Sequence, residues 1–261
     1  MNLSHQLGHC LKILGQFMKM KMISEFLKIY LMEELSALAY VSDATERYED
    51  AAKYIEDLIK KKKEDSTKDE KIIFYNSNKY IINSKRCALR TTNILKEKEE
   101  GYSTQYIPIV TNYKNILESE IIDLSKNIIN IINTYLLKKT LSDESKVFYL
   151  KMKADYCRYI CEIINTNENQ TYVEESEKCY KEASDLVQNF PWTNPIRLGL
   201  SLNYSVFYYE IKKNVNQAIK IGKEAIKGAK KQFDKIKEEE DKDASITLQT
   251  LKENVLIWEK E

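Results

Sequence analysis

The sequence predicts an all-α protein in which nine helices pack antiparallel to their neighbours. Only 6 glycines and 3 prolines occur in 261 residues, which is too little turn material for a many-stranded β protein. Apolar residues recur at helical spacing along most of the chain, and the stretches between these segments are short and polar. Because short joints connect antiparallel neighbours, we expect helix packing of the tetratricopeptide kind, although no fixed internal period is present.

The first thirty residues differ in composition from the rest of the chain. A single acid, Glu25, accompanies Lys12, Lys19, Lys21 and Lys28, with apolar residues between them. A basic amphipathic helix of this kind is typical of a membrane-surface or targeting segment, but it also fits an appended helix on the domain or a disordered lead. We prefer the second interpretation and treat residues 1–30 as a basic amphipathic extension of unknown role.

A helical domain is expected from residue 31 to residue 261. Its helices are predicted at residues 31–40, 47–59, 69–97, 105–137, 147–164, 172–189, 195–213, 215–233 and 244–258. Polar or cap-like residues occupy the joints, and the sequence EEG at residues 99–101 is expected to end the third helix.

Two of these helices begin at clear caps. Ser142 precedes two acids, which is a favourable arrangement at a helix N-terminus. Asn194 precedes Pro195, whose missing N–H costs nothing in the first helical turn. We therefore expect the fifth and seventh helices to start close to these residues.

Composition and motifs exclude several classes of function. The 41 basic and 40 acidic residues give a net charge of +1, so neither nucleic acid nor membrane is expected as a partner, and any anion site must be a local cluster. No enzyme, cofactor or metal is expected, because the sequence lacks a glycine-rich phosphate loop, a nucleophile with a matched histidine and a cluster of metal ligands. The spacing of His5, His9 and Cys10 has no accompanying carboxylate. Five cysteines without CxxC spacing indicate reduced thiols in a cytoplasmic or nuclear protein.

The stretch at residues 197–211 reads RLGLSLNYSVFYYEI and carries an unusual helix face. Asn203, Val206 and Glu210 lie on one side, beside an apolar edge that includes Leu202. An amide and a carboxylate two turns apart fit the wall of a groove that grips an extended peptide. They also fit a buried helix whose polar residues bond to neighbouring helices.

This stretch closely resembles a signature sequence of the 14-3-3 proteins, and SKVFYLKMKADYCRY at residues 145–159 resembles a second one. The resemblance covers roughly residues 31–258. It implies a concave groove and a non-enzymatic adaptor that binds phosphorylated client proteins in signalling. The alternative is a helical scaffold of the same fold, with weakened phosphopeptide specificity, that binds partners through another surface.

The resemblance also implies the site residues. The expected phosphate ligands are Lys79, Arg86, Arg158 and Tyr159. Three cations in one place repel each other, and a doubly charged phosphate offsets that repulsion. The expected peptide-binding residues are Lys151, Leu202, Asn203, Val206, Glu210, Ile246, Asn254 and Trp258.

Three positions depart from the family pattern. Thr247 and Thr250 stand where larger aliphatic residues are usual, so the apolar wall of the groove is expected to be weakened. Leu89 stands where the family usually has a tryptophan, which we interpret as a core substitution.

A dimer is the last implication of the resemblance, formed with a second copy or with another 14-3-3 chain. The first two helices of one subunit are expected to pack on the third and fourth of the other. The matching residues are Val41, Thr45, Arg47, Ala88, Thr92, Tyr113 and Glu120, with an ion pair between Arg47 and Glu120. A second family ion pair is lost, because Asp50 now corresponds to Ile116.

Overall fold

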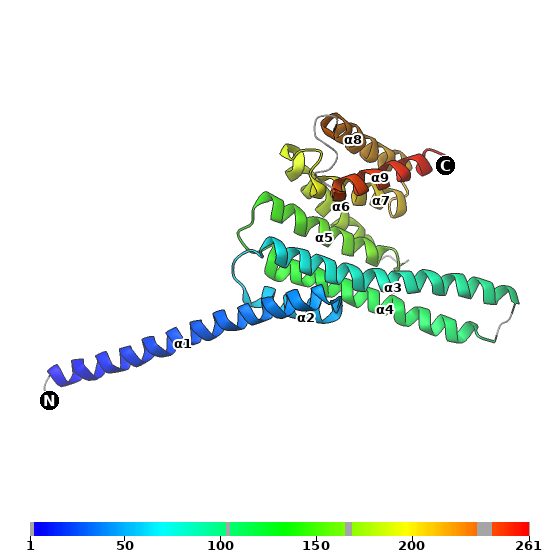
Figure 1. Cartoon of the computed structure of the whole chain (residues 1–261). Coiled ribbons are helices and arrows are strands. Elements are labelled where there is room, and N and C mark those ends of the chain that lie inside the picture. Colours follow the sequence, from blue (N-terminus) through cyan, green and yellow to red (C-terminus); the bar gives the residue numbers. More distant parts are fainter. Residues whose placement is uncertain (1–2, 103–104, 165–168, 234–241, 261) are drawn as a thin grey trace. The chain divides into compact units, whose positions relative to one another are not determined.

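The computed structural model describes residues 3–102, 105–164, 169–233 and 242–260 (Figure 1). Every regular element in these ranges is helical, which confirms the predicted all-α class. The α-helices are α1 (Leu3–Ala44), α2 (Tyr48–Lys61), α3 (Lys68–Tyr102), α4 (Ile107–Ile131), α5 (Asp143–Cys161), α6 (Asn169–Leu186), α7 (Pro195–Glu210), α8 (Val215–Phe233) and α9 (Lys242–Trp258). A π-helical turn, Ile132–Leu136, follows α4, and a 3₁₀ turn, Val187–Asn189, follows α6.

The predicted caps are confirmed. Ser142 accepts a hydrogen bond from the Ser145 N–H at 3.2 Å and starts α5. Asn194 accepts from the N–H groups of Ile196 and Arg197, at 2.9 and 3.2 Å, and starts α7. In both cases a side-chain oxygen satisfies backbone donors that have no partner within the first helical turn.

Two predicted helix boundaries are wrong. Helix α3 continues through Gly101 to Tyr102, so the sequence EEG does not end it. One glycine costs a helix only about 1 kcal/mol, which the remaining hydrogen bonds of a 35-residue helix can outweigh. Helix α1 runs without interruption from Leu3 to Ala44, although the sequence predicted a separate helix over residues 31–40.

The chain forms two compact units, residues 1–81 and residues 82–261. In the first unit, Leu35 and Ala39 of α1 are buried with Ile55 and Leu58 of α2. Only one face of α1 is buried there, and its residues 20–31 expose most of their apolar side chains. The basic amphipathic pattern predicted for residues 1–30 falls partly on residues 1–19, whose side chains lie outside the described part.

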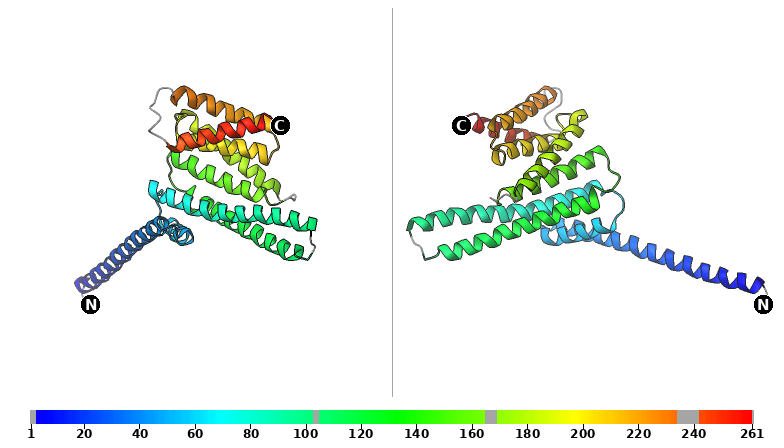
Figure 2. Two further views of the ribbon diagram at one scale, coloured as in Figure 1. Left: turned by 45° about the vertical axis from the view of Figure 1, so that its right-hand side comes forward. Right: turned by 180° about the vertical axis from the view of Figure 1, so that it is seen from behind.

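In the second unit, the core forms where α5, α6 and α7 meet and continues between α7, α8 and α9. The last three helices lie side by side in both views of Figure 2. Gly222 of α8 permits this packing, since a Cβ there would lie 2.5 Å from the Val255 side chain of α9. The part of α3 after Ile82 lies beside α4, and the Lys85 ammonium is 2.6 Å from the Glu120 carboxylate.

Candidate phosphopeptide site

Helix α5 carries an unusual number of buried polar residues. The buried residues of this helix, which is covered on nearly all sides, include Lys153, Asp155 and Arg158, each less than a tenth exposed. Charged groups are seldom buried unless they are paired, so each of these side chains needs a partner from a neighbouring helix. The pairs that result hold the candidate site together.

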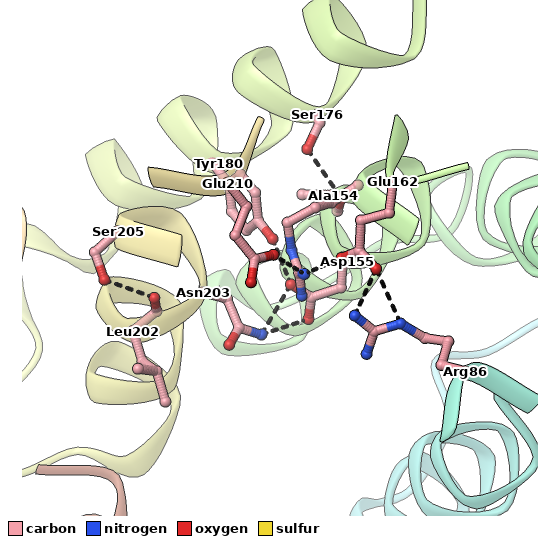
Figure 3. Close-up of polar contacts among 11 residues, drawn as sticks. Arg86, Ala154, Asp155, Glu162, Ser176, Tyr180, Leu202, Asn203, Ser205 and Glu210 are labelled. Carbon is pink, nitrogen blue, oxygen red and sulfur yellow. Dashed lines mark hydrogen bonds and ion pairs between the residues drawn. The ribbon is translucent and has the colours of Figure 1, made fainter. Parts of the chain in front are cut away.

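Asp155 is the acceptor at the centre of the site (Figure 3). Its carboxylate oxygens accept from the Asn203 amide of α7, both at 2.8 Å. One oxygen also accepts from the Tyr180 hydroxyl of α6 at 2.5 Å, and the other lies 2.9 Å from the Lys151 ammonium. One buried carboxylate therefore fixes side chains from α5, α6 and α7. Asp155 was not among the site residues expected from the sequence, although an acid in the middle of a largely apolar helix is a recognisable signal.

Two arginines from different helices meet at one carboxylate. Arg86 of α3 donates to Glu162 Oε2 at 2.6 Å, and Arg158 of α5 donates to Glu162 Oε1 at 2.6 Å. Arg158 also lies 3.5 Å from Glu210 Oε2 at the end of α7. Figure 3 shows Arg86 approaching Glu162 from α3, and Glu210 on the other side of Asp155. The structure therefore brings together Arg86 and Arg158, two of the expected phosphate ligands, and their binding of a phosphate remains a prediction.

The Tyr159 ring lies close to both guanidinium groups. Its ring centroid lies 4.3 Å from Arg86 Cζ and 4.7 Å from Arg158 Cζ. Cations this close to an aromatic face are attracted by the ring quadrupole. Burial raises the pKa of the Tyr159 hydroxyl, so the phenol stays protonated and can donate to an anion.

The charges of the site respond to burial in different ways. Burial lowers the pKa of Arg158, but the fields of Tyr180, Tyr159 and nearby carboxylates more than offset this and raise it well above its ordinary value. The guanidinium is therefore permanently charged. Burial raises the pKa of Glu210, and the positive charge of Arg158 only partly opposes the effect. The site therefore stabilises the ionised form of Glu210 poorly.

A pocket of about 450 Å³ opens beside the arginines. Its polar lining comes from α3, the end of α5, the start of α6 and the end of α7, and consists of Arg86, Arg90, Glu162, Asn169, Glu210 and Lys213. A smaller hollow of about 150 Å³ lies next to it, between Leu89, Ile121 and Tyr159. Among these residues, Arg90, Glu162, Asn169 and Lys213 were missed by the sequence analysis, because only the folded chain brings them together.

Comparison with known proteins gives the family. A family model described as 14-3-3 protein matches residues 38–259. The 14-3-3-like protein D of Nicotiana tabacum is 36% identical over 229 residues, which cover 87% of this chain and 92% of that relative. The 14-3-3 protein 2 of Entamoeba histolytica is 34% identical over 227 residues, with 87% and 95% covered. The chain belongs to the 14-3-3 family. Proteins of this family are non-enzymatic adaptors, so the chain is not an enzyme.

Lys79, the remaining residue expected at the 14-3-3 phosphate site, lies in the first unit. It is exposed, and its ammonium is 5.2 Å from the centroid of the Tyr75 ring. Arg86 belongs to the second unit, so the meeting of these two cations remains a prediction.

The residues expected to line the 14-3-3 groove differ in exposure. Leu202 and Val206 of α7 are half-buried and pack against the clusters formed with α8 and α9. Trp258 is buried, with its ring 4.9 Å from that of Tyr209. Ile246 is 66% exposed and Asn254 is half-buried, both on α9. Helices α7 and α9 are in contact, but an apolar groove wall between them remains a prediction.

The residues expected at a 14-3-3 dimer interface also differ in their exposure to solvent. Val41 and Tyr113 are largely exposed, as are Thr45 and Arg47, and Ala88 is half-buried. Thr92 is buried, and its hydroxyl donates to the Ala88 carbonyl at 2.8 Å. Both members of the expected intersubunit ion pair have a partner in their own chain, since Arg47 donates to Asp50 at 2.6 Å and Glu120 pairs with Lys85.

The described residues give two further findings. None of the helices in the described ranges combines the length and apolar composition that a membrane span requires. In the same ranges, no three histidine, cysteine, aspartate or glutamate side chains form a group that would hold a metal ion. His5, His9 and Cys10 lie outside the described side chains.

Proposed function

We propose that this 14-3-3 protein is an adaptor that binds phosphoserine- or phosphothreonine-containing segments of client proteins and regulates those clients in signalling. The observation that carries the proposal is the meeting of Arg86 and Arg158 at Glu162, with the Tyr159 ring close to both guanidinium groups. Two fixed guanidinium groups beside a phenol match the donors that a phosphate monoester requires.

Charge favours a phosphate over Glu162 as the partner of the two arginines. The carboxylate brings one negative charge to two guanidinium groups, whereas a phosphoserine brings nearly two and three acceptor oxygens. Glu162 lies in the turn after α5 and is itself a quarter exposed, so it can turn away when a phosphate arrives. We therefore infer that Glu162 keeps the arginines in place before the client binds.

Asn203 is proposed to hold the main chain of the client. Its amide nitrogen donates to both oxygens of Asp155, which orients the side chain and leaves its carbonyl oxygen to accept from a peptide N–H. Lys151, tied to Asp155, is proposed to support the same contact. Lys79, Asn254 and the apolar residues of α7 and α9 complete the proposed site by resemblance to the family.

We further propose that the protein works in the cytoplasm and nucleus, as a dimer with itself or with another 14-3-3 chain. Exposed apolar residues support the dimer, since Val41, Tyr113 and Ile116 are each about half exposed in the single chain. Light scattering of the full chain, and of a chain without residues 1–30, tests this. A monomer in both forms would contradict the dimer, and a dimer only after truncation would identify residues 1–30 as an inhibitor of assembly.

Calorimetry with one peptide in two forms tests the phosphopeptide function. The phosphoserine form is expected to bind with a micromolar dissociation constant, and the serine form is expected not to bind. Pull-down from lysate, with and without phosphatase treatment, checks the same point on natural clients. A protein that bound neither form, yet captured clients regardless of phosphatase, would favour the alternative scaffold that uses another surface.

A further inference from the structure

Two basic side chains of the 450 Å³ pocket take no part in the Arg86–Arg158 arrangement. Arg90 lies one helical turn after Arg86 on α3, and Lys213 lies in the joint between α7 and α8. Both are exposed and line the same pocket. Within the described ranges, neither forms an ion pair, whereas Arg86 and Arg158 are both paired with Glu162.

The pocket is larger than a single phosphate requires. A water molecule accounts for about 30 Å³ of the liquid, so a phosphate group with five heavy atoms needs on the order of 100–150 Å³. A volume of about 450 Å³ leaves room for a second group beside it. Arg90 and Lys213 line this pocket, and its two carboxylates, Glu162 and Glu210, both lie within 3.5 Å of Arg158, although the charge of Lys213 also lowers the pKa of Glu210.

The backbone at Lys213 is unusual. Its φ of 52° lies in the left-handed region, which glycine or asparagine adopts far more readily than lysine. Asn214 follows at once and caps α8, accepting from the Gln217 N–H at 3.0 Å. The Asn214 N–H donates to the Tyr208 carbonyl at 2.9 Å, so Lys213 is the left-handed residue that ends α7, and this turn places Lys213 at the edge of the pocket.

The adjacent lysine, Lys212, has different surroundings from Lys213. Lys212 pairs with Glu177 of α6 at 2.9 Å and does not line the pocket. Two consecutive lysines in one joint therefore have different surroundings. Lys212 is neutralised by an acid, and Lys213 faces an open pocket that already contains arginines.

From this geometry we propose that Arg90 and Lys213 form a second anion subsite, which takes a phosphorylated or carboxylate side chain close to the phosphoserine in the client sequence. The proposal rests on the function proposed above and narrows it. The protein would prefer client segments with two anionic residues to segments with one. Arg90 supplies paired donors, and Lys213 supplies a point charge that adapts to either anion.

Calorimetry with a set of peptides tests the subsite. The parent peptide carries one phosphoserine, and further peptides carry a second phosphoserine or an aspartate at each of the neighbouring positions on either side. We expect one position at which the second phosphoserine tightens binding to the wild-type protein about fivefold or more, with a smaller gain for aspartate. In Lys213→Gln this gain, measured as the ratio of the affinities of that variant for the doubly and singly phosphorylated peptides, should disappear.

Lys212→Gln is the matched control. It removes the same charge from the neighbouring residue, whose side chain lies outside the pocket. It should keep the full gain. If the parent peptide binds but a second anionic residue increases the affinity at none of the positions, the subsite is overturned and the proposed function stands. A gain that survives in Lys213→Gln would overturn the subsite as assigned. Failure of every peptide to bind would overturn both proposals.

Discussion

Asn203 of α7 donates to both carboxylate oxygens of Asp155 on α5, each at 2.8 Å, across 48 positions of sequence. This contact decides the orientation of the amide proposed to hold the client peptide. It also makes the orientation of a side chain on α7 dependent on a residue buried inside α5.

Replacement of Asp155 by asparagine tests that dependence. The new amide would point donors at Tyr180 or Asn203 and would leave Lys151 without its carboxylate, so the free energy of unfolding should fall by about 3–5 kcal/mol. Urea unfolding measures the change. Asp185→Asn, at an exposed position of α6, should be nearly neutral. A stable Asp155→Asn protein with unchanged peptide affinity would contradict the positioning role.

Charge reversal should affect binding at both arginines of the site, but protein stability at only one of them. Arg86 is 18% exposed, so Arg86→Glu should keep the fold and weaken phosphopeptide binding by more than the ~1.5–3 kcal/mol of one charge-assisted bond. Arg158 is 6% exposed, and Arg158→Glu would place a third carboxylate beside Glu162 and Glu210. That variant should also lose about 3–5 kcal/mol of stability.

Calorimetry and thermal unfolding of both arginine variants check this contrast. Lys230→Glu, with the same charge change at an exposed position of α8, is the control and should keep both affinity and stability. Normal affinity in a folded Arg86→Glu protein would exclude Arg86 from the phosphate site.

The ion pair between the buried Lys153 and the partly exposed Glu175 should give a distinct pH dependence. The hydrogen bond from Lys153 lowers the pKa of Glu175, so this carboxylate stabilises the fold above pH 4.5, and the stabilisation is lost as the pH falls through the lowered pKa. Burial lowers the pKa of Lys153, but the hydrogen bond to Glu175 and the fields of Cys179, Glu175 and Cys157 together outweigh burial and raise it. The ammonium therefore stabilises the fold below pH 10.5, and this contribution is lost as the pH rises through the raised pKa.

Glu175→Gln should consequently reduce the free energy of unfolding at neutral pH, because it leaves a buried ammonium with a neutral partner. Urea unfolding at acid, neutral and alkaline pH should show the deficit shrinking toward acid pH, where Glu175 of the wild-type protein is itself protonated. Glu174→Gln, on the same helix, is the control. A deficit that stays constant with pH would mean that the pair contributes through packing and not through charge.

Filling the hollow beside Leu89 should stabilise the protein. Leu89, Ile121 and Ile163 line a space of about 150 Å³ at the position where the family usually has a tryptophan. Leu89→Trp should raise the free energy of unfolding by about 0.5–2 kcal/mol. Leu95→Trp, at a half-exposed position of the same helix, should not. A lower melting temperature for Leu89→Trp would show that the hollow cannot accept the indole ring.

Aliphatic residues at Thr247 and Thr250 should tighten peptide binding. The Thr250 hydroxyl donates to the Ile246 carbonyl of its own helix at 3.0 Å, so its removal costs little. Added apolar surface on α9 should then contribute about 1 kcal/mol to the binding of peptides with apolar flanking residues. Calorimetry with Thr247→Ile/Thr250→Ile measures it, and Ser245→Ile at an exposed position is the control. Weaker binding would place these threonines in polar contact with the peptide.

Local information in the sequence was enough for most of the secondary structure. The caps at Ser142 and Asn194 act within three residues of their own position, so helix starts can be predicted without tertiary contacts. The boundary predictions failed at Gly101 and near residue 31, where the cost of one residue is small compared with the cooperativity of a long helix.

The sequence by itself determined the helical class and the family, and it identified Arg86, Arg158, Tyr159 and Asn203 as candidates, because helical spacing and signature stretches are local properties. The tertiary structure decided which charges meet. Arg86 reaches Glu162 across 76 positions, and Asn203 reaches Asp155 across 48. Such pairs depend on how helices cross and on which side chains the crossing removes from water. Lys213 faces the pocket, whereas the neighbouring Lys212 pairs with Glu177. This difference follows from the packing and cannot be predicted from helical spacing.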